Sequence, residues 1–250
     1  MNKIFKLFVP SYFLKIRREH LWLKSQTEPV AQRKCNICGF EGWFKSYGSP
    51  KRFDALCPSC FSLERQRLLL WAINDKGILS NIDYQKDKVL HFAAEPSLEK
   101  IFRKKFKDYA TADLNVNSDL QLNLEDIKVP DRTYKLVIAI HVLEHVDDIK
   151  ACRELNRILT DDGILIVMVP IVEGWEKTYE NNLIASDKER QLHFGQSDHL
   201  RCYGRDFRDR VSQSGLHLVS EITAEGKEAA EHNFLRGEKV FVFSKLPPAS

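Results

Sequence analysis

The most specific chemical pattern in this sequence is a set of four cysteines in two CxxC pairs, Cys35/Cys38 and Cys57/Cys60, with 18 residues between the pairs. Each pair offers two thiolates to one edge of a tetrahedral ion, and the stretch between them is long enough for a hairpin that brings the pairs together. Because no histidine or open coordination position belongs to the motif, we predict a closed, structural zinc site. The alternative interpretation is two redox-active dithiols, or unliganded thiols in a reducing cytosol.

A second group of residues with catalytic chemistry is rich in histidine. Asp198 and His199 are adjacent in a polar segment, and their adjacency predicts a carboxylate that orients an imidazole acting as a general base. His145 is a further candidate for such a base. His141, Glu144 and His145 also match HxxEH, an inverted zinc-peptidase motif that needs both histidines on one helix face. Because His141 directly follows a strand-like apolar run, a metallopeptidase is only a remote alternative.

The periodicity after residue 81 is that of an α/β fold. Short apolar runs alternate with amphipathic stretches, and runs such as 135–140 (KLVIAI) and 164–169 (ILIVMV) predict strands that are buried on both faces. The predicted strands are 88–93, 110–114, 120–124, 135–140, 164–169, 216–222 and 239–244. The predicted helices are 98–106, 147–159, ended by a turn at 161–163, and 205–214. This alternation predicts a mostly parallel sheet that is covered by helices on both sides.

Candidate binding residues stand where these strands end. In an open parallel sheet, ligands bind beyond the carboxyl ends of the strands, at the point where the strand order reverses. Residues 91–95 end the first strand, and Asp113 ends the second, 22 residues after position 91. An acidic side chain about 20 residues beyond the first turn is placed to bind the two hydroxyls of a ribose. Asn123 and Leu124 follow the third strand, and His141 follows the fourth.

The runs VLHFAAE, ADL, NLEDI, YKLVIAIHVLEHV and LNRILTDDGILIVMVP together resemble the class I S-adenosylmethionine-dependent methyltransferases over about residues 85–245. More narrowly, CNICG, CPSC followed by SLERQR, and FGQSDHLRCYGRDFRDRV resemble bacterial methyltransferases of the type 11-like group that carry an N-terminal zinc-binding module. The resemblance implies a Rossmann-like, mostly parallel seven-stranded sheet with a small N-terminal zinc ribbon. It also implies S-adenosylmethionine as cofactor, beside the structural Zn²⁺.

Carried over position by position, the resemblance implies that Asp113 binds the ribose and that Asn123 and Leu124 flank the adenine, with His141 beside the cofactor. The implied cofactor-binding residues are His91, Phe92, Ala93, Ala94, Glu95, Asp113, Asn123, Leu124 and His141. The first loop departs from the family pattern, because alanines replace the usual glycines. We therefore expect a turn that avoids positive φ and is wider than usual. We also expect Glu95 to pair with the amino group of the methionine moiety.

Composition limits the remaining possibilities. The 250 residues carry a net charge of +3 and are 43% hydrophobic, which is typical of a globular protein, and no apolar run suits a membrane span or signal peptide, so we expect a cytoplasmic protein. The first 80 residues hold 14 Lys and Arg against 6 Asp and Glu. Residues 1–24 read as a basic amphipathic segment, which either contacts the inner membrane face or packs on its own domain. We divide the chain into an arm (1–30), a zinc ribbon with linking helix (31–80) and a methyltransferase domain (81–250).

The sequence thus predicts a methyltransferase acting on a small-molecule or glycan-related acceptor, a class that the resemblance suggests without fixing the substrate. The main alternative is an RNA methyltransferase whose basic ribbon, with Trp43, Phe44, Tyr47 and Phe53, binds RNA. Those aromatics could instead form the core of the ribbon itself. A nicotinamide-dependent oxidoreductase is disfavoured because GxGxxG is missing after the first strand. The oligomeric state stays open.

Overall fold

The computed structural model describes residues 13, 15–17, 19–20, 29–114, 117–235 and 237–247. Most of the predicted arm, residues 1–30, therefore lies outside the described residues, although the described positions between 13 and 20 are helical. The predicted membrane contact through residues 1–24 stays a prediction. In the part of the chain that the structure describes, no helix has both the length and the apolar character that crossing a bilayer requires.

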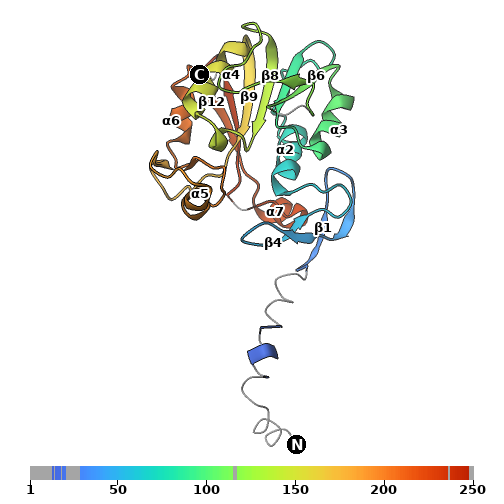
Figure 1. The fold of residues 1–250 in the computed structure, drawn as a ribbon. Helices are drawn as coiled ribbons and strands as arrows, with labels where there is room; N and C mark the ends of the chain where they lie inside the picture. Colours follow the sequence, from blue (N-terminus) through green and yellow to red (C-terminus); the bar gives the residue numbers. More distant parts are fainter. Residues whose placement is uncertain are drawn as a thin grey trace, which may run out of the picture.

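A seven-stranded sheet forms the centre of the molecule (Figure 1). Its order is β12-β13-β9-β8-β5-β6-β7. The strands are β5 (Lys88–Phe92), β6 (Asp108–Asp113), β7 (Leu120–Gln121), β8 (Tyr134–Ile140), β9 (Leu159–Met168), β12 (His217–Ile222) and β13 (Val240–Ser244). Neighbours from β7 to β9 are parallel, whereas β13 runs antiparallel to both β9 and β12. The predicted mostly parallel, Rossmann-like seven-stranded sheet is confirmed.

Both faces of the sheet are buried, which explains why its central strands are continuously apolar. Leu136 and Ile138 on β8 face α2 (Glu64–Asp75) and α3 (Pro96–Lys105) in one core. Val137 and Ala139, one residue out of phase, face α4 (Asp148–Ile158) and α6 (Phe207–Ser212) in the other. The two pairs of helices cover opposite sides of the sheet (Figure 1). The predicted linking helix is α2, which packs on one face of the sheet.

The strand order reverses between β5 and β8. From β5 the chain moves outward to β6 and β7, and from β8 it moves the other way to β9. Connections that leave two adjacent parallel strands in opposite directions open a crevice above their carboxyl ends. The loops after β5, β6 and β8 therefore surround this crevice.

The N-terminal module consists of two short hairpins, β1 (Gln32–Lys34) with β2 (Glu41–Trp43) and β3 (Lys45–Tyr47) with β4 (Arg52–Leu56). It lies against α7 (Gly226–His232), as Figure 1 shows. His232 Nδ1 donates to the Lys34 carbonyl over 2.8 Å, and Arg33 Nη1 donates to the Ala230 carbonyl over 2.6 Å. These bonds join the ribbon to a segment almost 200 residues further along the chain.

Several elements differ from those predicted. The sequence pattern does not predict α5 (Asp187–Phe194), α7, β10 (Tyr179–Glu180), β11 (Arg201–Cys202) or the 3-10 turn η2 (Leu143–His145). Only one residue of α5 is buried, so it lacks the apolar periodicity that predicts a helix. The turn expected at 161–163 lies inside β9, where a register shift opposite β8 accommodates it.

Candidate active site

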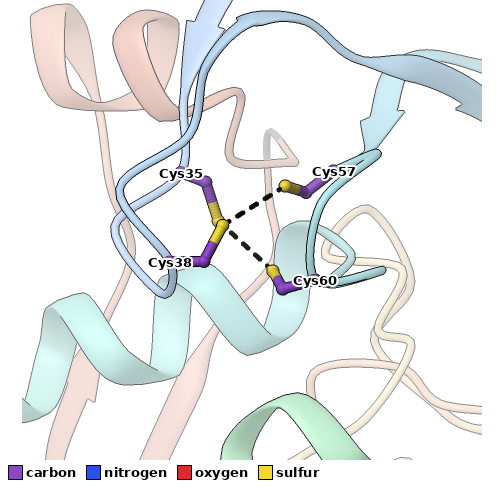
Figure 2. A group of neighbouring side chains, drawn as sticks. All are labelled: Cys35, Cys38, Cys57 and Cys60. Carbon is purple, nitrogen blue, oxygen red and sulfur yellow. Dashed lines mark hydrogen bonds between the residues drawn. The ribbon is translucent and has the colours of Figure 1, made fainter.

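The four cysteines of the ribbon converge on one point. Figure 2 shows their sulfur atoms turned toward one another. The Sγ atoms of Cys35 and Cys60 are 3.6 Å apart, those of Cys38 and Cys57 are 3.7 Å apart, and all four lie within 4.8 Å of one another. Four sulfur donors with no other ligand position suit a closed tetrahedral Zn²⁺ site. The predicted zinc-binding module is therefore confirmed as a four-sulfur cluster.

A cavity of about 600 Å³ lies in the crevice at the strand ends. It is lined by Phe92 at the end of β5, by Asp113 at the end of β6, and by the buried residues Leu122 and Leu124. The full lining is Phe92, Ala93, Ala112, Asp113, Leu114, Leu122, Leu124, His141, Val142, His145, Val146, Arg190 and Asp198. We call this the first cavity. Its single carboxylate from β6 beside apolar walls has the polarity that a nucleoside requires.

The turn after β5 corrects one expectation. Ala93 has a φ of 47°, in the left-handed region, and its N–H donates to the Ala112 carbonyl over 2.9 Å. The turn is therefore tight despite its alanines, and the prediction that it avoids positive φ is wrong. Left-handed backbone costs a non-glycine residue about 1–2 kcal/mol, which the surrounding sheet must offset. Ala94 follows on the rim and lines an adjoining cavity with Asp113.

His91 does not reach the first cavity. It is fully buried on the other face of β5, where its Nδ1 lies 2.8 Å from the Tyr109 hydroxyl and its ring packs against Phe102. Burial lowers the pKa of His91 to about 4. The residue is thus a neutral core histidine. The resemblance placed it at the cofactor because it occupies the position after which the family's first loop begins.

Asn123 and Glu95 also point elsewhere. Asn123 is exposed, and its Oδ1 accepts a hydrogen bond from the Glu125 N–H over 2.9 Å, which closes a local turn. Glu95 Oε1 accepts from Arg65 Nε over 3.1 Å and from Gln66 Nε2 over 2.9 Å, so this carboxylate joins α3 to α2. Neither side chain lines the first cavity. Leu122, to which the sequence pattern assigns no role, lines the first cavity together with Leu124.

His141 lies at the centre of the site. It follows β8 with a φ of 51°, its Nδ1 is 3.2 Å from Glu144 Oε1, and its Nε2 is 2.9 Å from Glu238 Oε1. Burial opposes protonation, but the two carboxylates outweigh it and raise the pKa of His141 to about 9. His141 is therefore a cation at neutral pH and not a general base. Glu238 is 97 residues away in sequence, and no local pattern indicated it.

His141 also borders a second cavity of about 300 Å³, which lies between the ribbon, α2 and the loops after β9. Its lining residues are Ser49, Arg52, Glu64, Arg65, His141, Pro170, Phe194, Gly195, Gln196, His199, Arg201, Cys202, Leu235 and Glu238. Most of these side chains are polar or charged. The second cavity thus suits a small, polar molecule.

The predicted pair of Asp198 and His199 is not formed. Asp198 Oδ2 instead lies 3.2 Å from Nδ1 of His145, and the ring of His199 stands edge-on to that of His145 with 4.7 Å between centroids. His199 is 5% exposed, and burial lowers its pKa. The three predicted catalytic residues are therefore together, but the carboxylate faces the other histidine, since the loop after Phe194 turns His199 inward.

The HxxEH interpretation does not fit this geometry. Only residues 143–145 form a helical turn, and His141 precedes it in a left-handed conformation. The donor atoms of Glu144 and His145 gather with His199, whereas His141 faces Glu238. The two motif histidines therefore do not share a helix face, as the peptidase site would require.

Comparison with known proteins agrees with the fold. A family profile described as a methyltransferase domain matches residues 65–221. The chain belongs to this methyltransferase family. The expected class of protein is thereby confirmed, and the matched segment of the methyltransferase begins in α2 and includes every strand end that surrounds the first cavity.

Individual relatives of this chain are distant. An uncharacterised protein of Methanocaldococcus jannaschii is 38% identical over 74 residues, a stretch that covers 25% of this chain and 33%, or about a third, of that protein. A solved protein assigned as a sarcosine dimethylglycine methyltransferase from Galdieria sulphuraria is 13% identical, with a TM-score of 0.50 over 72% of this chain and 85% of the other. The [4+2]-cyclase SpnF is 10% identical, with a TM-score of 0.50 over 70% and 80%. These likenesses concern the fold alone.

Proposed function

We propose that this protein transfers a methyl group from S-adenosylmethionine in the first cavity to a small acceptor in the second. The observation that carries the proposal is the first cavity itself, which opens where the strand order reverses and has Asp113 at the end of β6. When bound, the cofactor supplies a methyl group on a positively charged sulfur, which is already an activated leaving group. The protein has mainly to align the two reactants.

Asp113 and the leucines of the first cavity fit the nucleoside half of this cofactor. A carboxylate can accept hydrogen bonds from two neighbouring ribose hydroxyls, and we propose this role for Asp113, which lines the first cavity. Leu122 and Leu124 offer buried apolar surface to the adenine ring. Phe92, Ala93 and His141 complete the residues that we propose to hold the cofactor.

The acceptor is proposed to enter through the second cavity. His141 lines both cavities, so a molecule in the second lies next to a cofactor in the first. The charged and polar wall favours a small polar acceptor, for which a glycan-related molecule rich in hydroxyl groups is one candidate. His145, Asp198 and His199 stand where the cavities approach each other and are proposed to activate the acceptor's nucleophilic atom.

Isothermal titration calorimetry with S-adenosylmethionine tests the cofactor site. Replacing Asp113 with asparagine removes a charged acceptor that contributes about 1.5–3 kcal/mol of hydrogen bonding, so we expect a loss of affinity of about 10- to 100-fold. Asp126→Asn is the matched control, because Asp126 is exposed and its carboxylate pairs with Lys128 on the surface. Unchanged affinity in Asp113→Asn, or no binding by the folded wild-type protein, would contradict the proposal.

RNA is the second candidate acceptor, and one observation favours it. Trp43 and Tyr47 on the ribbon are about half exposed, whereas Phe44 is buried as part of the small ribbon core. Exposed aromatic rings on a basic module can stack on unpaired bases. Transfer RNA binding by the full chain should then weaken with salt and with Trp43→Ala, but not with Trp175→Ala, an exposed tryptophan outside the ribbon. No binding at low salt would exclude this candidate.

We further propose that the protein works in the cytoplasm. None of the six cysteines in the described part of the chain forms a disulfide bond, which suits a reducing compartment. Contact of residues 1–24 with the inner membrane face stays a prediction, which co-sedimentation of the full chain with anionic vesicles would test.

A further inference from the structure

A second group of metal-ligating side chains lies apart from the ribbon cysteines. The carboxylate of Glu144 and the rings of His145 and His199 each place one donor atom within 4.8 Å of the others. Glu144 and His145 come from η2, directly after β8, and His199 comes from the loop before β11. Two loops that are more than 50 residues apart thus bring three donors to one point.

Glu144 is the residue that points to a bound cation. Its side chain is 1% exposed, and its Oε1 lies 3.2 Å from Nδ1 of His141. Its other oxygen, Oε2, has no hydrogen-bond partner among the described residues. A buried carboxylate oxygen without a partner is costly and rare in native structures. A metal ion bound to this oxygen would remove the cost.

The two histidines complete a donor set of two nitrogens and one oxygen. Bonds of about 2.0–2.2 Å to one ion place neighbouring donors roughly 3.4 Å apart, so the present spacing needs only side-chain adjustment. Asp198 lies 3.2 Å from the His145 ring, and metal-binding histidines commonly donate their second ring N–H to such a carboxylate. Imidazole nitrogens with one carboxylate favour divalent transition metals over Mg²⁺ or Ca²⁺.

The position of the cluster relates it to the acceptor. His145 and Asp198 line the first cavity, whereas His199 lines the second. We propose that Glu144, His145 and His199 hold a divalent transition-metal ion that binds and activates a hydroxyl group of the methyl acceptor. This role rests on the proposed function. The ion's open coordination positions would face the boundary between the two cavities.

In the proposed step, the acceptor oxygen binds the ion and its proton leaves to solvent water, so that the oxygen becomes a better nucleophile. The oxygen then forms a bond to the methyl carbon while the carbon–sulfur bond breaks, and the electron pair of that bond stays on sulfur. The two histidines act in this arrangement as ligands rather than as proton acceptors. Asp198 is a positioning residue for His145.

The metal site is tested directly with the full-length protein whose ribbon is loaded with zinc. Mn²⁺ is added, and free Mn²⁺ is measured by electron paramagnetic resonance, because this ion prefers oxygen and nitrogen donors and leaves the thiolate site alone. We expect saturable binding of about one Mn²⁺ per chain. His145→Ala, His199→Ala and Glu144→Gln should each weaken binding at least about tenfold, whereas His217→Ala, on the distant edge strand β12, should not.

Calorimetry of the wild-type protein with S-adenosylmethionine separates this inference from the proposed function, because it measures cofactor binding without added metal. Cofactor binding together with no Mn²⁺ or Co²⁺ binding beyond the ribbon overturns the metal site and leaves the proposed function standing. Metal binding that is equal in all variants also overturns it. Specific metal binding without cofactor binding supports the site but removes the proposed function and the acceptor role.

Discussion

Arg67 joins three parts of the molecule, so its replacement should reveal how strongly the ribbon is held. This α2 residue is fully buried and donates hydrogen bonds to the carbonyl oxygens of Ser62 over 2.8 Å, His232 over 3.0 Å and Asn233 over 3.2 Å. Its guanidinium also lies 4.9 Å from the centroid of the Phe44 ring. Phe44 belongs to the ribbon, Ser62 follows its last cysteine, and the other two carbonyls belong to the end of α7.

Arg67→Met keeps most of the side-chain volume but leaves three buried carbonyls without their donor. Hydrogen bonds from a charged donor contribute about 1.5–3 kcal/mol each, and the cost of burying the cation, which lowers the pKa of Arg67, offsets part of that sum. We therefore expect the free energy of unfolding to fall by about 3–5 kcal/mol.

Urea denaturation followed by tryptophan fluorescence measures this change, since four tryptophans report on the fold. The control is Arg132→Met, because Arg132 pairs with Asp161 at the exposed surface and its loss should cost less than about 1 kcal/mol. If Arg67→Met cost no more than this control, the argument that one buried cation holds the three parts together would fail.

Three further predictions concern the ribbon, the core and the first turn. Native mass spectrometry should find about one zinc ion per chain in the wild type and none in the Cys57→Ser/Cys60→Ser variant, whose ribbon should become sensitive to protease. The His91 ring is neutral in the folded protein, whereas in the unfolded chain it becomes protonated below its usual pKa near 6.5. The contribution of the neutral, buried ring to the free energy of unfolding is therefore complete above that pH and is lost as the pH falls toward 4. Between pH 7.5 and pH 5 the wild type should therefore lose about 2 kcal/mol more than His91→Phe in urea denaturation, and an equal loss would argue against the buried assignment. Ala93→Gly should relieve the strain of the left-handed backbone and increase the free energy of unfolding by about 0.5–1 kcal/mol, which a slightly higher melting temperature would show. A lower melting temperature would show that the turn is unstrained.

The features that sequence reasoning located are those whose causes are local. Strands β8 and β9 contain continuous apolar runs because both faces of each strand are buried. The spacing of the cysteines within each CxxC pair is itself enough to predict the metal site. Asp113 could be placed at the site because the residue that ends β6 must lie at the crevice. Helix α5 could also have been predicted, since Ser186 and Glu189 have the residue types and spacing of a capping box, which they form at the start of this helix.

The features that sequence reasoning missed depend on contacts between distant segments. Asp198 faces His145 because the loop after α5 folds against η2. Adjacency in the sequence predicts His199 as its partner, and this prediction is wrong. The charge of His141 depends on Glu238, which reaches it from the loop before β13. In the same way, the tight turn at Ala93 depends on a hydrogen bond to the Ala112 carbonyl on β6. The conformational preference of alanine alone does not predict this contact.

The ion pairs around the second cavity relate the ribbon to the choice of acceptor. Arg52 pairs with Glu64 over 2.9 Å, and its side chain is 34% exposed whereas that of Glu64 is 4% exposed. Arg65 and Glu95 show the same asymmetry, at 29% and 18%. In both pairs the carboxylate is the more deeply buried partner, so the guanidinium groups are the more accessible members and would favour oxygen-rich or anionic groups on the proposed acceptor. Because Arg52 lies on β4, directly before Cys57 and Cys60, the zinc site that orders the ribbon also fixes one side of the second cavity, where we propose that the acceptor binds.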